Sequence, residues 1–172
     1  MLGLILLVRT PMMLVKTITA FTIAHSITLA AATFGWIGVP EASVNALIAL
    51  SIVFVAIDVL KLRRGQIGWS VRYPWAIAFG FGLLHGFGFA GALSGIGLPE
   101  SSLPAALLFF NVGVEIGQLA FVGIVLGLFW AHRQLEAILP RGYETAALYG
   151  MGTIASFWFL SRMNDMVSPI LG

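Results

Sequence analysis

Long, continuous apolar runs separated by short polar segments dominate this chain. A membrane-spanning helix needs about 20 mainly apolar residues. Stretches of that kind occupy the ranges 17–37, 44–60, 75–96, 104–130 and 143–161. The runs are continuous, which argues against the alternating pattern of membrane barrel strands. The pattern predicts an all-α integral membrane protein, a single transmembrane domain built as a bundle of five transmembrane helices.

A sixth, shorter apolar segment occupies residues 2–8. It is too short to span a bilayer. It also lacks the basic start and the small-residue cleavage site of a signal peptide. We therefore expect either the last turns of a helix whose start is missing or a short segment at the membrane interface.

The composition supports the membrane assignment and removes several classes of function. Hydrophobic residues make up 59% of the chain and charged residues only 9%, against about 25% charged in soluble domains. The chain has no cysteine, which excludes disulfides, thiolate metal sites and iron–sulfur clusters. It has no basic tail, so we expect no nucleic acid as a partner. Because the chain is so apolar, we expect the lipid bilayer to surround it.

The placement of charge predicts the orientation. If the five helices alternate, one side of the membrane receives Arg9, Lys16, Lys61, Arg63, Arg64, Arg72, Arg133 and Arg141. The other side receives Glu41, Glu100 and Arg162. The positive-inside rule places the basic side in the cytoplasm of a bacterial inner (cytoplasmic) membrane and the C-terminus outside it. Tryptophans at the predicted helix ends fit interfacial anchoring; they are Trp36, Trp69, Trp75, Trp130 and Trp158.

Two segments resemble each other and suggest an internal repeat. IGVPEASV at 37–44 matches IGLPESSL at 96–103 at an offset of 59 residues, and His25 matches His85 at an offset of 60. This favours a duplicated hairpin, 17–60 and 75–130, with both copies in the same orientation. Transporters often place substrate sites at such interfaces. Alternatively, Pro and Glu simply start helices well. Glycine pairs four residues apart predict close helix packing; they are Gly82/Gly86, Gly91/Gly95, Gly113/Gly117 and Gly123/Gly127.

Three ionisable side chains fall near the middle of three predicted helices: His25, His85 and Glu115. Ionisable groups inside a membrane are costly and usually functional. Two imidazoles and a carboxylate suit Ni²⁺, Co²⁺, Zn²⁺ or Fe²⁺. A hydrogen-bonded network that fixes helix packing and a proton relay are the alternatives. Supporting polar residues lie on the same helix faces; they are Thr22, Ser26, Asn111 and Gln118.

Asp58 stands apart, near the cytoplasmic end of the second predicted helix beside Lys61. It suits either an ion pair at the membrane surface or a role in cytoplasmic release. The sequence shows no pairing of a nucleophile with a base, so we do not expect an enzyme. We also see no nucleotide-binding motif.

Four ordered motifs resemble those of the HupE/UreJ family. They are TAFTIAHSITL at 19–29, LIALSIVFVA at 47–56, FGFGLLHGFGFA at 79–90 and NVGVEIGQLA at 111–120. The family comprises membrane proteins associated with hydrogenase and urease systems, and some members are nickel permeases. The resemblance implies metal permeation, with His25, His85 and Glu115 at matching positions. Members usually carry an earlier helix with a His- and Asp-containing motif, so this sequence resembles a member shortened at the N-terminus.

Two functions follow as hypotheses. The first is a permease for Ni²⁺ or a similar divalent metal, carried as cargo and with no tightly bound cofactor, using the His/Glu site, with Asp58 toward the exit. The second is a non-transporting structural or assembly subunit of a larger membrane complex. A further reading is a metal-dependent assembly factor that binds metal without moving it. Other membrane protein subunits and further copies of the chain are the expected protein partners.

Overall fold

The computed structural model describes residues 1–8, 10–94, 99–134 and 143–171, and these are helical apart from short connections. The elements in chain order are α1 (Leu2–Leu7), α2 (Pro11–Thr33), α3 (Glu41–Arg63), α4 (Trp69–Arg72), α5 (Pro74–Ser94), the 3₁₀ turn η1 (Glu100–Ser102), α6 (Leu103–Gln134) and α7 (Tyr143–Leu171).

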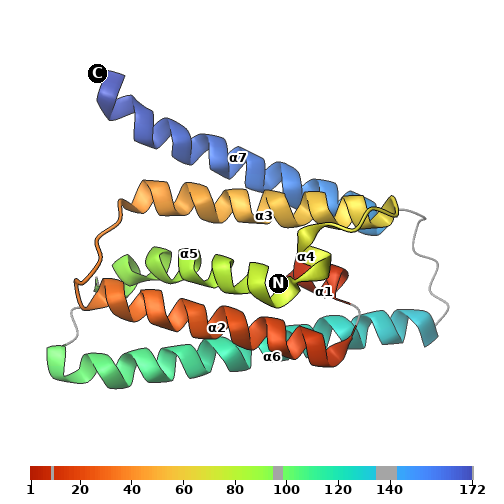
Figure 1. The fold of residues 1–172 in the computed structure, drawn as a ribbon, viewed down its shortest axis with the longest axis horizontal. Coiled ribbons are helices and arrows are strands. Elements are labelled where there is room, and N and C mark those ends of the chain that lie inside the picture. Colours follow the sequence, from red (N-terminus) through yellow and green to blue (C-terminus); the bar gives the residue numbers. More distant parts are fainter. Residues whose placement is uncertain (9, 95–98, 135–142, 172) are drawn as a thin grey trace.

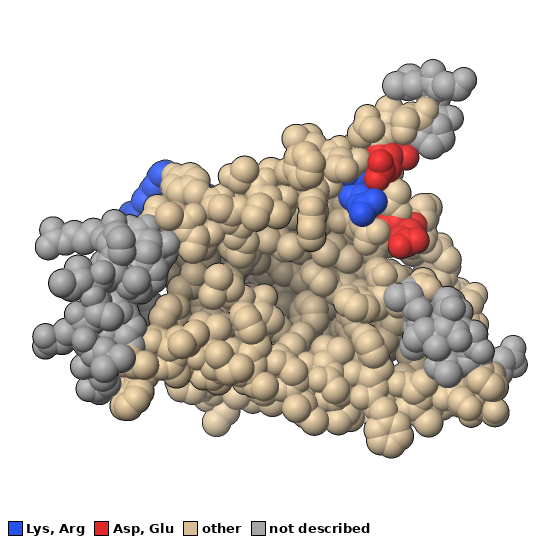
Figure 2. All heavy atoms as spheres, turned by 180° about the vertical axis from the view of Figure 1, so that it is seen from behind, with Lys and Arg blue, Asp and Glu red and all other residues tan. Residues whose placement is uncertain are grey.

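The long helices lie side by side and alternate in direction. In Figure 1, α2, α5 and α7 run one way, and α3 and α6 run the other way. The end of α3 and the start of α5 therefore meet at one end of the bundle, so Lys61, Arg63, Arg64 and Arg72 gather there. Figure 2 shows one face on which Lys, Arg, Asp and Glu occur only toward the two ends, with a hollow near the middle. This is the distribution expected of a protein that crosses a bilayer.

Helix starts and stops follow the local sequence. The Thr10 side chain caps α2 by accepting a hydrogen bond from the Met13 backbone N–H at 3.4 Å, and Pro11 occupies the first turn. These signals start α2 six residues before the predicted span at 17. Gly35 and Gly65, with φ of 74° and 78°, follow the ends of α2 and α3. Glycine tolerates this left-handed conformation, and so it ends a helix cleanly.

Helices α2 and α5 form the closest packing in the described chain. A β-carbon on Gly82 would lie 2.3 Å from the Phe21 carbonyl oxygen, and one on Gly86 would lie 2.4 Å from that of His25. The two backbones therefore touch at both glycines. This confirms the packing role predicted for Gly82/Gly86. The helices run in parallel with a register close to 60 residues, the offset of the predicted repeat. The repeat itself stays a prediction, because residues 95–98 of the second copy lie outside the described chain.

The short helix α1 is buried inside the bundle. Leu4 and Leu7 pack with Val55 and Val59 of α3. On the other side of α1, Ile5 packs with Ile18 of α2 and Val122 of α6, among other residues. The apolar segment at residues 2–8 thus fills the space between α3 on one side and α2 and α6 on the other.

Among the described residues, three helices are long and apolar enough to cross a membrane: Pro11–Thr33, Glu41–Arg63 and Leu103–Ala131. Helix α5 covers most of the predicted span 75–96, whereas α7 begins with the predicted span 143–161 and continues to Leu171; these two spans stay predictions. Arg9, Arg141 and the side chain of Arg133 lie outside the described part of the chain. The sequence pattern gave no indication of α4.

The glycines of α6 do not pack against the described chain. A β-carbon on Gly113, Gly117, Gly123 or Gly127 would meet no atom within 4 Å. Among the described residues, the packing role predicted for these pairs is therefore wrong.

Alanine substitution at Gly86 and at Gly117 tests the close crossing of α2 and α5. We expect Gly86→Ala to lower the free energy of unfolding by about 1–3 kcal/mol, because the new methyl group collides with α2. Gly117→Ala is the matched control, since both variants gain the same helix propensity of about 0.5–1 kcal/mol. The measurement is unfolding by titration with SDS in mixed micelles. Equal stability of the two variants would contradict the packing described above.

Candidate functional site

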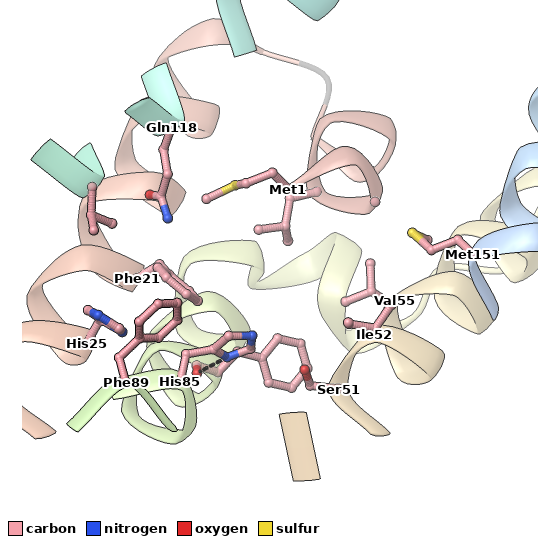
Figure 3. A pocket seen from close by; sticks show the side chains of 14 residues that line it. Met1, Phe21, His25, Ser51, Ile52, Val55, His85, Phe89, Gln118 and Met151 are labelled. Atoms are coloured by element: carbon pink, nitrogen blue, oxygen red, sulfur yellow. Dashed lines mark hydrogen bonds between the residues drawn. The ribbon is translucent and has the colours of Figure 1, made fainter. Parts of the chain in front are cut away.

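A cavity of about 300 Å³ lies in the middle of the bundle. It is bounded by α1, α2, α3, α5, α6 and α7, and its walls are mainly apolar. His25 of α2 and His85 of α5 both line it. Figure 3 shows the two imidazoles with the rings of Phe21 and Phe89 beside them. The structure thus brings together two of the three predicted ligands, on the two helices that cross most closely.

The tautomer of His85 follows from its hydrogen bond. Its Nδ1 lies 2.7 Å from the backbone carbonyl oxygen of Phe81, one turn earlier on α5. A carbonyl only accepts, so Nδ1–H must be the donor and the lone pair resides on Nε2. Histidines that bind metals are commonly oriented by a hydrogen bond of this kind. His85 is therefore held with one nitrogen free to act as a ligand.

His25 is buried among aromatic rings. Only 2% of its surface is exposed, and neither Nδ1 nor Nε2 has a hydrogen-bond partner among the described residues. Its ring centroid lies 5.9 Å from that of Phe21, 5.6 Å from that of Phe89 and 6.3 Å from that of Phe110. Leaving a buried polar group unpaired costs about 1–3 kcal/mol. An apolar side chain at this position would fill the same space without that cost, so the unpaired imidazole favours a role beyond packing.

The aromatic residues around the histidines were missed by the sequence reasoning. Phe21 and Phe81 each precede a histidine by four residues, and Phe89 follows His85 by four residues. On a helix these positions are neighbours, and the Phe21 ring lies 5.2 Å from that of His85. The signal that could have found them is the same Phe-x-x-x-His spacing in both predicted repeat copies.

Glu115 lies elsewhere, at the contact of α2 with α6. The Thr19 hydroxyl donates to its Oε1 at 2.9 Å, and the Thr22 hydroxyl donates to Oε1 of Gln118 at 3.3 Å. Gln118 also lines the cavity, whereas Glu115 does not. The hydrogen bond between Thr22 and Gln118 therefore links the cavity wall to the α2–α6 contact that also contains Thr19 and Glu115.

The predicted three-ligand cluster is not assembled in the described part of the chain. No three His, Asp or Glu side chains there are placed to hold a metal ion together. Glu115 Oε2 and Asn111 Oδ1 are buried without a hydrogen-bond partner. The Asn111 amide donates to the Leu107 carbonyl oxygen, and the Ser26 hydroxyl to that of Thr22. A ligand role for Glu115 stays a prediction.

Asp58 is buried near the end of α3 and does not line the cavity. Its Oδ2 accepts hydrogen bonds from the backbone N–H of Ser70, at 3.3 Å, and from the Ser70 hydroxyl. Its Oδ1 lies 3.8 Å from Lys61 Nζ. The ion pair predicted at this position is therefore present, and the carboxylate also fastens α4 to α3.

Comparison with known proteins gives the family of the chain. The family model described as HupE / UreJ protein matches residues 1–162, nearly the whole chain. The chain belongs to the HupE/UreJ family. This family is associated with nickel or cobalt transport and with the maturation of urease and hydrogenase. No curated protein and no solved structure matches the chain.

Within this HupE/UreJ protein, Phe89 is positioned to control access to His25. We expect Phe89→Ala to increase the rate at which diethylpyrocarbonate modifies His25 by about tenfold, because removing the ring uncovers the imidazole. Phe79→Ala, on the same helix and away from the described ring contacts, is the control and should leave the rate unchanged. Peptide mass spectrometry identifies the modified residue. A rate at His25 that does not respond to Phe89→Ala would exclude this shielding role.

Proposed function

We propose that the protein is a permease for a divalent transition-metal ion such as Ni²⁺, and that the ion passes through the cavity between His25 and His85. The observation that carries the proposal is the pair of imidazoles from two helices on one cavity in the middle of the bundle. His85 presents Nε2 as a free nitrogen, and both nitrogens of His25 lack a hydrogen-bond partner among the described residues. Neutral imidazole is a preferred ligand of nickel and its neighbours in the first transition series.

The walls of the cavity determine how such an ion is held. Most of the lining is aromatic and aliphatic, and beside the two imidazoles the other polar or thioether groups on the wall belong to Ser51, Gln118, Met1 and Met151. Two protein ligands leave the remaining coordination positions of the ion to water. A site of this kind holds an ion weakly enough to release it, as permeation requires.

We infer the orientation from charge. The end of the bundle that carries Lys61, Arg63, Arg64 and Arg72 faces the cytoplasm of a bacterial inner membrane, and the C-terminus lies on the opposite side. We also infer that the protein acts by transport and not by catalysis.

Cells that express the chain should take up radiolabelled nickel in a manner that depends on both histidines. We expect His25→Ala and His85→Ala each to reduce initial uptake at least tenfold, because each removes a ligand from the path. Thr153→Ala, an exposed polar position on α7, is the control and should transport normally. Membrane insertion is verified for each variant by immunoblotting of membrane fractions.

Two further variants in the same assay define the part played by Glu115. Glu115→Gln keeps an acceptor for the Thr19 hydroxyl but removes the charge. If the Glu115→Gln variant loses uptake, a ligand role for Glu115 is supported. If the variant takes up nickel normally, Glu115 is assigned to helix packing. Retained uptake in the double variant His85→Ala, Glu115→Ala would contradict the ligand assignment altogether.

Uptake should also depend on pH. Imidazole binds a metal only after losing its proton. We therefore expect uptake to fall as the pH on both sides of the membrane is lowered into the acid range. The measurement is initial uptake in proteoliposomes with equal pH on both sides. Uptake that rises toward acid pH would argue against neutral imidazole ligands.

A second candidate function is a structural or assembly subunit, and the surface of α6 favours it. The open glycine positions of α6 allow another helix to approach closely; such faces mediate helix association in membranes. This hypothesis expects other membrane proteins or further copies of the chain on that face. Extraction as a single chain in mild detergent, together with histidine-dependent uptake, would favour the permease instead.

A further inference from the structure

The connection from α3 to α5 carries an unusual concentration of positive charge. Residues 61–75 include Lys61, Arg63, Arg64 and Arg72 and contain no Asp or Glu. All four basic residues are exposed. Arg63 also donates a hydrogen bond to the Thr145 hydroxyl at 3.4 Å. Arg64 follows the last residue of α3 and Arg72 is the last residue of α4, the short helix that Figure 1 draws between the end of α3 and the start of α5.

Large apolar and aromatic side chains are exposed on the same segment. Ile67 is 77% exposed and Trp69 is 73% exposed. The Arg72 guanidinium carbon lies 5.6 Å from the centre of the Tyr73 ring, and that ring lies 6.2 Å from the Trp69 ring. A shallow hollow of about 310 Å³ is lined by Ile67, Gly68, Trp69, Arg72 and Tyr73. Guanidinium and aromatic groups thus share one concave surface.

The surface is held in place by Asp58. Its carboxylate accepts two hydrogen bonds from Ser70, in the first turn of α4. A β-carbon on Gly68 would lie 2.7 Å from Asp58 Oδ2, so only glycine allows the segment to approach this closely. Ser70 and Asp58 are both buried. The exposed residues of α4 are therefore presented on a fixed backbone.

We propose that this surface, formed by Lys61, Arg64, Ile67, Trp69, Arg72 and Tyr73, binds the headgroup of an anionic phospholipid. Arg64 and Arg72 match the phosphodiester charge, and the Asp58 carboxylate held against the segment is buried and already pairs with Lys61 and Ser70. Trp69 is an amphipathic side chain of the kind that anchors proteins at the membrane interface, and the exposed Ile67 adds apolar surface beside it. A zwitterionic lipid fits less well, because its own cation would face the arginines. The site goes beyond the proposed function, since lipid binding does not require metal transport.

The test is lipid binding by the purified full chain, measured by native mass spectrometry from mild detergent. Phosphatidylglycerol is compared with phosphatidylcholine. We expect phosphatidylglycerol to bind preferentially, and Arg72→Gln to weaken its binding about fivefold, the effect of one basic residue near a charged membrane surface. Arg162→Gln is the matched control, because Arg162 is exposed on α7 and pairs with Asp165 at 3.1 Å. It should leave binding unchanged.

Three outcomes would overturn the proposal. These are equal binding of both lipids, an Arg72→Gln variant that binds like the wild type, and displacement of the lipid by inorganic phosphate at equal concentration. The last outcome would assign the surface to a free anion. Asp58→Asn gives a second check, since a variant with normal thermal stability but weakened lipid binding supports the anchoring role. None of these readouts depends on metal uptake, so failure here and failure of the permease proposal are distinguishable.

Discussion

The close approach of α2 and α5 is the constraint on which the rest of the structure depends. Where Gly82 and Gly86 meet the α2 backbone, the two helices lie too near for any larger side chain. Because His85 lies between these glycines in sequence, the same contact places it across from the α2 segment that carries His25. Loss of this contact would separate the imidazoles and widen the cavity. The glycines therefore act on the site without lining it.

The aromatic shell follows from the same parallel packing. Helices that run in one direction with matched register place equivalent residues opposite one another, so Phe21 and Phe81 both lie on the cavity beside the histidines. The rings exclude water from His25 and provide no hydrogen bond in its place. The environment therefore leaves the imidazole nitrogens available to a ligand that enters the cavity.

The sequence predicted the features that depend on one helix at a time. Continuous apolar runs identified every long helix, and mid-span polarity identified His25 and His85. It did not predict contacts between helices: Glu115 is at mid-helix as expected but bonds to Thr19. The position of a residue along a membrane helix can be inferred from its place within the apolar run. The contact that its side chain makes depends on which other helix packs against it. For the same reason the spacing of the α6 glycines did not reveal that nothing described lies against them.

Two carboxylates, the buried Asp58 and the half-buried Glu115, illustrate how position influences the role of one chemical group. Asp58 has two hydrogen bonds from Ser70 and a nearby ammonium, so its charge is compensated and it fastens α4 to α3. Glu115 has one hydrogen bond, from Thr19, and one buried oxygen without a partner. A carboxylate that is incompletely compensated in an apolar setting gains most from an approaching cation. Under the proposed function, an ion that leaves the histidines would meet its next oxygen ligands on the α2–α6 side of the cavity, where Gln118 already lines the wall.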